Sequence, residues 1–205
     1  MIKVNKVIDS VPYTKSVIPD NRLKYLANKC HEVLQKTPGN VLEIGVYKGG
    51  TLLAMADKIL PFFSQTKFYG IDTFSGHPYT DGHPVHPVGK YRDVDFVHMQ
   101  SIIKRRSIQK SVFLFKGKVE EIFKSLDLKN ISFAHIDCDL YLPTKFCCDY
   151  ITKVINHGGM IYFDDYDHEH CPGATRAIEE SFPKNLINLV YLEEDDTGWS
   201  CFINL

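Results

Sequence analysis

The sequence lacks the features that mark membrane, secreted and disordered chains. No apolar run approaches the roughly 20 residues that a membrane helix needs, and the opening residues MIKVNKVIDS hold no hydrophobic stretch typical of a signal peptide. Internal repeats and low-complexity tracts are also missing, and the apolar share of 44% is ordinary for a globular core. We therefore expect one compact domain over residues 1–205, cytoplasmic and without a membrane partner.

An excess of charge of either sign is absent too. Lys and Arg total 24 and Asp and Glu total 25, which leaves a formal net charge of −1. This balance excludes binding to nucleic acid through bulk positive charge. The basic run from Lys104 to Arg106 is short, and we expect it on the solvated face of a helix, so no nucleic-acid partner is predicted.

Cysteine pairs of the CxxC type do not occur. The six cysteines are scattered along the chain, and only Cys147 and Cys148 are adjacent. Neither a disulfide framework nor a zinc ribbon fits this distribution. We expect reduced thiols that pack as small hydrophobic side chains.

What the sequence does contain is an alternation of short apolar runs and amphipathic stretches. An N-terminal helical segment is expected over about residues 1–38, with a helix from Asn21 to Lys36 that takes Asp20 as its N-cap. Strands are predicted over 41–46, 67–71, 112–115, 131–136 and 160–163, and helices over 51–60, 119–126, 143–155 and 174–182. This order predicts an α/β fold with a mostly parallel sheet and helices on both faces.

The C-terminal part of the chain has a different pattern. Two strands, 186–192 and 199–203, flank the acidic turn EEDDTG, which predicts a closing antiparallel hairpin.

The segment from Ser75 to Tyr91 is long, loop-like and rich in Gly, Pro and His. Because it follows a strand, we expect it at the ligand edge of the sheet as a lid (residues 75–91). His77, His83 and His86 fall in this lid, and His168 and His170 follow an acidic pair. Their spacing is compatible with Zn²⁺ ligation, but we favour contacts with an acceptor or with solvent.

Ligands of open α/β sheets bind outside the carboxyl ends of the strands, so the residues that finish each strand carry most information. The first strand runs into EIGVYKGGT, in which glycines allow a tight turn before a helix N-terminus. The spacing G-x-x-x-G differs from the pyrophosphate loop G-x-G-x-x-G and suits a nucleoside with an amino-acid tail. A purely structural turn is the alternative. The candidate cofactor residues of this loop are Glu43, Gly45, Gly49, Gly50 and Thr51.

The next two strand ends extend the same interpretation. Asp72 finishes the second strand, where a carboxylate can accept hydrogen bonds from both hydroxyls of a ribose. A helix-capping role for Asp72 is the alternative. The third strand leads into the loop from Lys116 to Val119, and Gly117 and Val119 are expected beside the adenine if the ribose is at Asp72.

The fourth and fifth strands end in acids. Asp137 and Asp139 follow one strand and Asp164 and Asp165 follow the next. Carboxylates that converge at adjacent strand ends repel one another unless they are protonated or bind a cation, and oxygen ligands suit Mg²⁺ or another divalent ion. We infer a metal site here, with solvated turn acids as the alternative.

Taken together, the motifs VLEIGVYKGGT, YGIDTFSG, HIDCDLYLPT and HGGMIYFDDY resemble one family. They are similar to the S-adenosylmethionine-dependent and metal-dependent O-methyltransferases of the macrocin and mycinamicin type, which methylate sugar hydroxyls in antibiotic biosynthesis. The resemblance runs from about Tyr13 to the terminal hairpin. It implies a class I methyltransferase fold with seven strands.

The resemblance also implies roles for single residues. Glu43, Gly45 and Gly49 would lie along the methionine part of S-adenosylmethionine, and Asp72 would hold its ribose. The metal ligands would be Asp137, Asp164 and Asp165. Asp137 thus stands among the cofactor-binding, metal-binding and catalytic residues.

Asp139 matches the aspartate proposed as general base in this family. The related catechol-type enzymes carry a catalytic lysine where this chain has Leu140, so the base is either Asp139 or a histidine. His135 precedes these acids on the strand, and both burial and contact with the cofactor are open for it.

The expected activity is thus transfer of a methyl group to a hydroxyl of a sugar or sugar-like acceptor, either a small molecule or a glycan. Three alternatives stay open: a binding protein of the same fold without transferase activity, a nicotinamide-dependent oxidoreductase and a metal-dependent hydroxylase of the cephalosporin-hydroxylase type. The loop spacing and the acids count against the oxidoreductase, and no set of two histidines and one carboxylate for redox iron is evident in the sequence. The identity of the acceptor and assembly into a homo-oligomer stay open.

Overall fold

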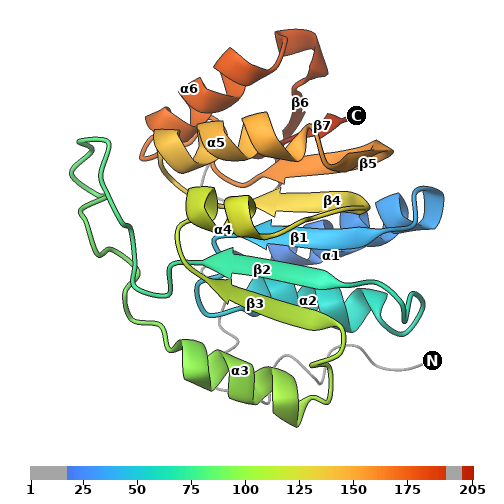
Figure 1. The fold of residues 1–205 in the computed structure, drawn as a ribbon. Coiled ribbons are helices and arrows are strands. Elements are labelled where there is room, and N and C mark those ends of the chain that lie inside the picture. The colour runs from blue at the N-terminus through green and yellow to red at the C-terminus, as the bar shows by residue number, and fades with distance from the viewer. Residues whose placement is uncertain (1–17, 193–199) are drawn as a thin grey trace.

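A single mixed sheet organises the molecule, as the computed structural model shows for residues 18–192 and 200–205. The strand order is β3-β2-β1-β4-β5-β7-β6, with parallel pairing from β3 to β5 and antiparallel pairing of β7 with both neighbours (Figure 1). The strands are β1 (Asn40–Ile44), β2 (Phe68–Asp72), β3 (Val112–Lys116), β4 (Ile131–Ile136), β5 (Ile155–Phe163), β6 (Asn188–Val190) and β7 (Ser200–Asn204). The mostly parallel sheet with an antiparallel C-terminal end confirms the predicted fold class.

Helices cover both faces of this sheet. They are α1 (Asp20–Lys36), α2 (Gly50–Ile59), α3 (Phe96–Arg105), α4 (Val119–Ser125), α5 (Tyr141–Ile151) and α6 (Pro172–Ser181). In Figure 1, α4 and α5 lie in front of the sheet and α1 and α2 behind it. Two apolar clusters match these layers, one joining α1, α2 and α3 to the sheet and the other joining α4, α5 and α6 to it. All six residues of β4 are buried, as expected for a strand covered on both faces.

The strand ends point to one edge of the molecule. The arrowheads of the parallel strands lie on the left of Figure 1, where the long green segment between β2 and α3 also lies. Parallel pairing brings the ends of β1 and β4 level, since Ile44 pairs with Ile136, and Ile136 pairs in turn with Phe163 of β5. The residues that follow these three strands therefore begin at the same height.

Several predicted boundaries are wrong. Asp20 is not the N-cap of α1 but its first residue, because the chain enters the helix at Pro19 and no side chain caps it. The helix predicted to reach Ile155 ends at Ile151, since Ile155 already pairs with β4 as the first residue of β5. The strand predicted over 186–192 is a short 3₁₀ turn at Lys184–Leu186 followed by the three residues of β6.

The basic run lies at the end of a helix, as expected, whereas other predictions fall outside the described residues. The helix α3, whose last turn carries Lys104 and Arg105, is capped by Asp95, whose side chain accepts hydrogen bonds from the amides of Val97 and His98. The acidic turn at 193–198, Trp199 and the first 17 residues of the N-terminal helical segment lie outside the described residues. In the part of the chain that the structure describes, no helix is long and apolar enough to cross a membrane.

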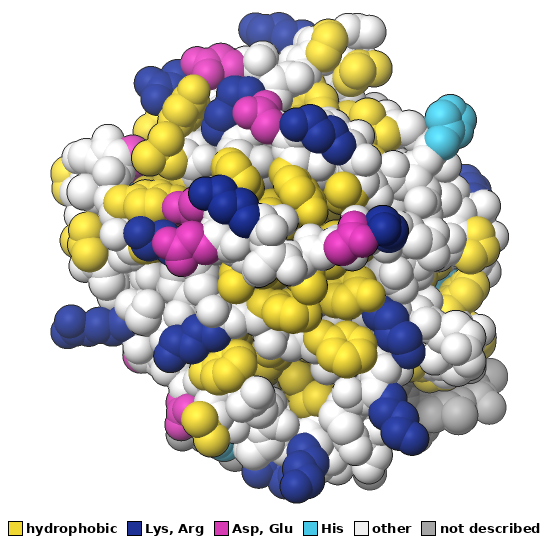
Figure 2. Space-filling view, in the orientation of Figure 1, with side chains coloured by type: hydrophobic (Ala, Val, Ile, Leu, Met, Phe, Trp, Pro, Cys, Tyr) yellow, Lys and Arg dark blue, Asp and Glu magenta, His cyan; other side chains and the backbone are white. Residues whose placement is uncertain are grey.

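Apolar side chains also reach the surface in front of the sheet. Figure 2 shows hydrophobic groups spread between the charged residues on this face. Below α4, the rings of Tyr69 and Phe113 stack with 5.9 Å between their centroids, and Phe115 lies 6.4 Å from Tyr69. These half-buried rings extend the front apolar cluster towards β3, at the edge of the sheet.

Candidate active site

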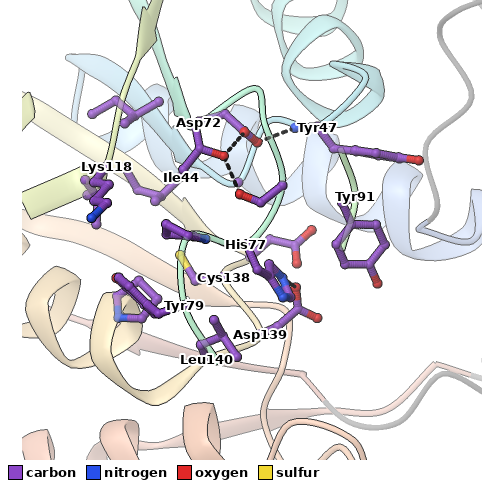
Figure 3. Close-up of a pocket in the computed structure, with 18 of the residues that line it drawn as sticks. Ile44, Tyr47, Asp72, His77, Tyr79, Tyr91, Lys118, Cys138, Asp139 and Leu140 are labelled. Atoms are coloured by element: carbon purple, nitrogen blue, oxygen red, sulfur yellow. Dashed lines mark hydrogen bonds and ion pairs between the residues drawn. The ribbon is translucent and has the colours of Figure 1, made fainter. Parts of the chain in front are cut away.

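A pocket opens at the carboxyl ends of the parallel strands, and its empty space of about 790 Å³ includes a part that is open to solvent (Figure 3). Its walls come from the ends of β1 and β2, the lid, the loop between β3 and α4 and the loop after β4. The residues that line it are Ile44, Gly45, Tyr47, Ile71, Asp72, Thr73, Gly76, His77, Pro78, Tyr79, Tyr91, Gly117, Lys118, Val119, Glu120, Asp137, Cys138, Asp139, Leu140 and Pro143. Of the residues singled out at the strand ends in the sequence, Gly45, Asp72, Gly117, Val119, Asp137 and Asp139 thus meet at one cavity.

Gly45 brings the ends of β1 and β4 together. Its φ is +88°, and a Cβ at this position would lie only 1.7 Å from the carbonyl oxygen of Asp137. The backbone amide of Asp137 in turn donates to the carbonyl of Ile44 at 2.9 Å. A side chain at Gly45 would push the Asp137 backbone away, so the glycine is needed for close approach of two chain segments.

Asp72 points its carboxylate at the turn after β1. One oxygen, Oδ2, accepts from the amide of Tyr47 at 2.8 Å (Figure 3). The other, Oδ1, accepts from the amide of Phe74 at 2.6 Å and from the hydroxyl of Thr73 at 3.5 Å. Burial raises the pKa of Asp72, and these two backbone donors oppose that rise. A carboxylate has about four acceptor positions, so Oδ2 keeps one for a ligand in the pocket, and on Oδ1 the second position holds only the long contact with the Thr73 hydroxyl.

The other predicted cofactor residues divide into two groups. Gly45, Gly117, Val119 and Asp137 line the pocket with Asp72. The remaining four lie outside the lining: Glu43 inside β1, Gly49 as the N-cap of α2, and Gly50 and Thr51 in the first turn of that helix.

Glu43 takes part in a buried chain of charged groups behind the pocket. Its carboxylate lies 3.1 Å from Nδ1 of His135, and Nε2 of His135 lies 3.8 Å from Oδ1 of Asp164. Burial lowers the pKa of His135, but the neighbouring carboxylates outweigh it and raise that pKa to about 10. Burial also raises the pKa of Glu43. Of the two possibilities left open for His135, the structure therefore places it in the interior.

Arg22 of α1 adds a second positive group to this chain. Its guanidinium donates to Oδ2 of Asp164 at 3.2 Å and to the backbone carbonyl of Asp164 at 3.4 Å, and both side chains are buried. The sequence indicated neither the pairing of His135 with Glu43 nor this contact, because Arg22 looks like an ordinary polar residue of an amphipathic helix. Only the packing of α1 against the end of β5 brings Arg22 to Asp164.

The carboxylate trio (Asp137, Asp164 and Asp165) forms as predicted. Each residue offers an oxygen, and these three oxygens lie within 4.8 Å of one another. Burial and the charges of Asp165, Asp164 and Asp139 raise the pKa of Asp137 well above its usual range. Burial, together with Asp139 and Asp164, raises the pKa of Asp165 to about 8. Both shifts combine the cost of burying a charge with repulsion among neighbouring acids.

The trio suits a divalent cation. Oδ1 of Asp164 is buried and has no hydrogen-bond partner among the described residues. A buried oxygen without a donor is costly unless a cation or solvent satisfies it. Three carboxylate oxygens at this separation are the ligand type that Mg²⁺ and similar hard ions prefer. The residues present therefore fit the ion that the sequence predicted.

Asp139 lies beside the trio without belonging to it. Its backbone is in the left-handed region, with φ of +60°, and its amide donates to Oδ2 of Asp165 at 2.8 Å. The side chain turns into the pocket, where Oδ2 contacts Nε2 of His77 at 3.0 Å (Figure 3). The Sγ of Cys171 lies 3.7 Å from Oδ1 of Asp139 and 3.4 Å from Asp165, a contact that the sequence did not indicate.

The lid is folded against the pocket. The amide of His77 donates to the carbonyl of Lys90 and the amide of Gly89 to the carbonyl of His77, both at 2.9 Å, which closes the base of the lid. Gly76, His77, Pro78, Tyr79 and Tyr91 form part of the pocket lining.

One sequence-based statement needs correction. No set of two histidines and one carboxylate was evident in the sequence, yet the structure brings His77, His86 and Asp139 together, with a ligand atom of each within 4.8 Å of the others. Asp139 is far from both histidines along the chain, 62 residues in the case of His77, and only the path of the lid places its histidines over the loop after β4.

Comparison with known proteins places this geometry in context. The family model described as macrocin O-methyltransferase (TylF) matches residues 3–186. No curated protein sequence matches the chain significantly.

Solved structures share the fold at low identity. The calicheamicin methyltransferase CalS11 superposes with a TM-score of 0.75 at 19% identity, over 94% of this chain and 88% of that one. The O-methyltransferase NovP gives 0.74 at 20% identity, over 90% and 79%. An O-methyltransferase from Bacillus cereus, solved in complex with SAH, gives 0.60 at 16% identity, over 91% and 80%.

The contact between Gly45 and Asp137 can be tested by a matched pair of substitutions. Gly82 in the lid has nearly the same φ, +92° against +88°, but nothing lies within 4 Å of a Cβ placed there. We expect Gly82→Ala to cost about 1 kcal/mol of unfolding free energy, from backbone strain alone. Gly45→Ala should cost at least about 2 kcal/mol more, because the strands must separate.

Urea unfolding of the two variants and the parent chain measures this difference. Equal losses for Gly45→Ala and Gly82→Ala would contradict the close approach of the two strand ends.

Proposed function

The chain belongs to the macrocin O-methyltransferase family, and from that premise we propose that it transfers the methyl group of S-adenosylmethionine to a hydroxyl of a sugar or sugar-like acceptor, with a divalent metal ion such as Mg²⁺ at the carboxylate trio. As a member of this family the chain is an O-methyltransferase. The methyl donor, the metal and the acceptor class are the proposal. They rest on the pocket, on the trio and on the relatives described above.

One observation carries the proposal. Asp137 belongs to both constellations at once, since it lines the pocket and offers an oxygen to the trio. A ligand in the pocket and a cation at the trio would therefore be neighbours. An acceptor hydroxyl between them would meet the methyl donor, the cation and a base within one small volume.

The nucleoside end of the pocket is formed by Asp72 and the loop after β3. The free position on Oδ2 of Asp72, and the position on Oδ1 that holds only the long Thr73 contact, are suited to two ribose hydroxyls, and Gly117 and Val119 leave an apolar wall beside them. The turn at Gly45 then leads towards Asp137, along which the amino-acid part of the donor would extend. The Bacillus cereus relative was solved with SAH, which supports a donor of this class.

Asp137, Asp164 and Asp165 would hold the metal ion, which when bound lowers the pKa of an acceptor hydroxyl. The chain's own residues prepare that position. Arg22 and His135 hold Asp164 from behind, and the amide of Asp139 holds Asp165. These contacts fix the ligand oxygens before any ligand arrives, so little reorganisation is left for binding.

Asp139 is the group placed to accept the hydroxyl proton. Oδ2 of its carboxylate is engaged by His77, whereas Oδ1 has only long contacts with Cys171 and His86. Oδ1 is therefore the atom on which a proton would be taken up. Leu140, which stands where the catechol-type enzymes carry lysine, is apolar and cannot serve as the base.

A sugar acceptor agrees with the relatives and with the polar end of the pocket. CalS11 is described as a TDP-rhamnose 3′-O-methyltransferase. Neighbouring hydroxyls of a sugar present two oxygens to one cation, as a chelating acceptor must. The rings of Tyr47, Tyr79 and Tyr91 line the pocket near the lid and offer flat apolar surfaces to a sugar ring.

Removing the Asp72 carboxylate should weaken binding of the methyl donor. We expect Asp72→Ala to raise the dissociation constant of S-adenosylhomocysteine by about 10-fold to 100-fold, because two hydroxyls lose a charged acceptor. Isothermal titration calorimetry measures the effect. Asp127→Ala, which removes an exposed carboxylate paired with Lys129, is the matched control and should leave the constant unchanged.

Binding of NADH in place of S-adenosylhomocysteine would overturn the assignment of the pocket. Unchanged affinity in Asp72→Ala would overturn the role given to that residue alone.

Substitutions should distinguish the carboxylates that bind the metal from the carboxylate that serves as the base. We expect Asp164→Ala to abolish both Mg²⁺ binding and methyl transfer, because it removes a metal ligand and a carboxylate that Arg22 contacts. Asp139→Asn should retain Mg²⁺ and lower turnover by about 10²-fold to 10⁴-fold, the usual contribution of a general base. Turnover with a panel of nucleotide sugars and calorimetry with Mg²⁺ provide the two measurements.

Chelation provides the matching test in the parent enzyme. EDTA should stop methyl transfer and added Mg²⁺ should restore it. Transfer that continues unchanged in EDTA would show that the acids serve the acceptor by hydrogen bonding alone.

The lid should respond to ligands. Residues 75–91 close part of the pocket, so we expect slower proteolysis within this segment when S-adenosylhomocysteine and an acceptor are both present. Mass spectrometry of the cleavage products locates the cuts. Equal cleavage with and without the two ligands would mean that the segment is a static wall and no lid.

A further inference from the structure

Five of the nine histidines of the chain gather above the loop after β4. His77 and His86 come from the lid, and their rings lie 5.3 Å apart. His83 lies 5.8 Å from His86 and 5.9 Å from His170, which itself lies 5.4 Å from His168. The proposed methyl transfer uses none of these rings as a reacting group.

Three of the groups in this region point their ligand atoms at one another. Nε2 of His77 lies 3.0 Å and Nδ1 of His86 lies 3.8 Å from the two oxygens of Asp139. All three ligand atoms fall within 4.8 Å. Ligands of one ion at about 2.0–2.2 Å stand roughly 3–4 Å apart, so these atoms need only small movements to close around it. The group is enclosed as well, with His86 only 2% and His77 10% exposed in their side chains.

His86 is held in the orientation that a metal ligand requires. Its Nε2 lies 2.8 Å from the backbone carbonyl of His170, so Nε2 carries the proton and donates it there. Nδ1 is then left as an acceptor and faces Asp139. Histidines that bind metals almost always donate their other ring nitrogen to a carbonyl or carboxylate in this way. This contact is independent of the clustering and supports the same conclusion.

We propose that His77, His86 and Asp139 form a second cation site, the lid histidine site, which binds a divalent transition metal such as Zn²⁺ or Co²⁺. Two imidazole nitrogens and one carboxylate select such ions over Mg²⁺, whereas the carboxylate trio has the opposite preference. The site joins the lid to the loop after β4. An ion bound there holds the lid against the pocket. It lies on the side of the Asp139 carboxylate that faces the two histidines.

The positive charge of Lys90 opposes binding of a cation at His86. Its ammonium lies 3.5 Å from Nδ1 of His86, the nitrogen that would bind the metal. A second positive charge at this nitrogen must displace the ammonium, which swings away on its flexible stem. Removal of the Lys90 charge should therefore strengthen metal binding, an effect opposite in sign to that of removing a ligand.

The experiment is a titration of the protein with Co²⁺ in millimolar Mg²⁺, followed by visible absorption. Mg²⁺ fills the carboxylate trio, and nitrogen ligation gives Co²⁺ an absorption that free Co²⁺ lacks. We expect His77→Gln and His86→Ala each to weaken Co²⁺ binding by at least about 10-fold. Lys90→Gln should tighten it by about 2-fold to 5-fold. His157→Ala, an exposed histidine at the start of β5, is the control and should change nothing.

Two further variants separate this site from the metal of the proposed function. Asp164→Ala should keep the Co²⁺ absorption, because the lid histidine site does not use Asp164. Circular dichroism confirms that each variant is folded, and His77→Gln, which keeps a polar group of similar size, tests the site if His86→Ala does not fold. The readout needs no turnover, so it holds whether or not methyl transfer is found.

Limited proteolysis provides a second readout of the clamp. Zn²⁺ should protect residues 78–88 in the parent chain and in His157→Ala but not in His77→Gln. Three results would overturn the proposal. The Co²⁺ absorption could survive in both histidine variants, or it could be lost in Asp164→Ala and kept in the histidine variants. The third result is weaker Co²⁺ binding in Lys90→Gln.

Discussion

Repulsion among four carboxylates is the constraint on which the rest of this site depends. Asp137, Asp139, Asp164 and Asp165 follow two adjacent parallel strands, and parallel pairing of β4 with β5 leaves them no room to spread. Burial and this crowding together raise the pKa values of Asp137 and Asp165. Groups that favour negative charge face the cluster: Arg22 and His135 beside Asp164, and the backbone amide of Asp139 on Asp165. A cation at the trio completes the same compensation.

The strand-end acids were predictable from the sequence because the alternation of apolar strands and amphipathic helices is visible in short stretches of the chain. Apolar runs that alternate with helices predict a parallel sheet, and a parallel sheet brings its strand ends together without any knowledge of side-chain packing. Asp72, Asp137 and the pair Asp164 and Asp165 were found in this way. The boundary between α5 and β5 was not, since Ile155 fits equally well in the last turn of a helix or in a strand. Its pairing with Ile131 decides between them.

Contacts that depend on the packing of distant elements could not be predicted. Arg22 is 142 residues away from Asp164 in the chain, and the approach of His86 to Asp139 depends on the path of the lid. Glu43 shows the same limit for a residue that the sequence did single out. The family resemblance implies a place beside the cofactor for it, yet the structure buries it against His135. The pattern of strands and turns specifies where a residue lies along the sheet. The group that its side chain contacts depends on the residue beside it on the neighbouring strand.

Asp139 connects the parts of the site that the sheet alone does not connect. Its amide holds a member of the carboxylate trio, its carboxylate faces the pocket, and its two oxygens meet histidines of the lid. A left-handed backbone at this position makes all three contacts possible, because the chain must reverse between β4 and α5 within a few residues. Movement of the lid therefore changes the surroundings of the proposed base directly. In the proposed function, lid closure and proton transfer are therefore coupled through one side chain, and the left-handed backbone at Asp139 is the structural cost of that coupling.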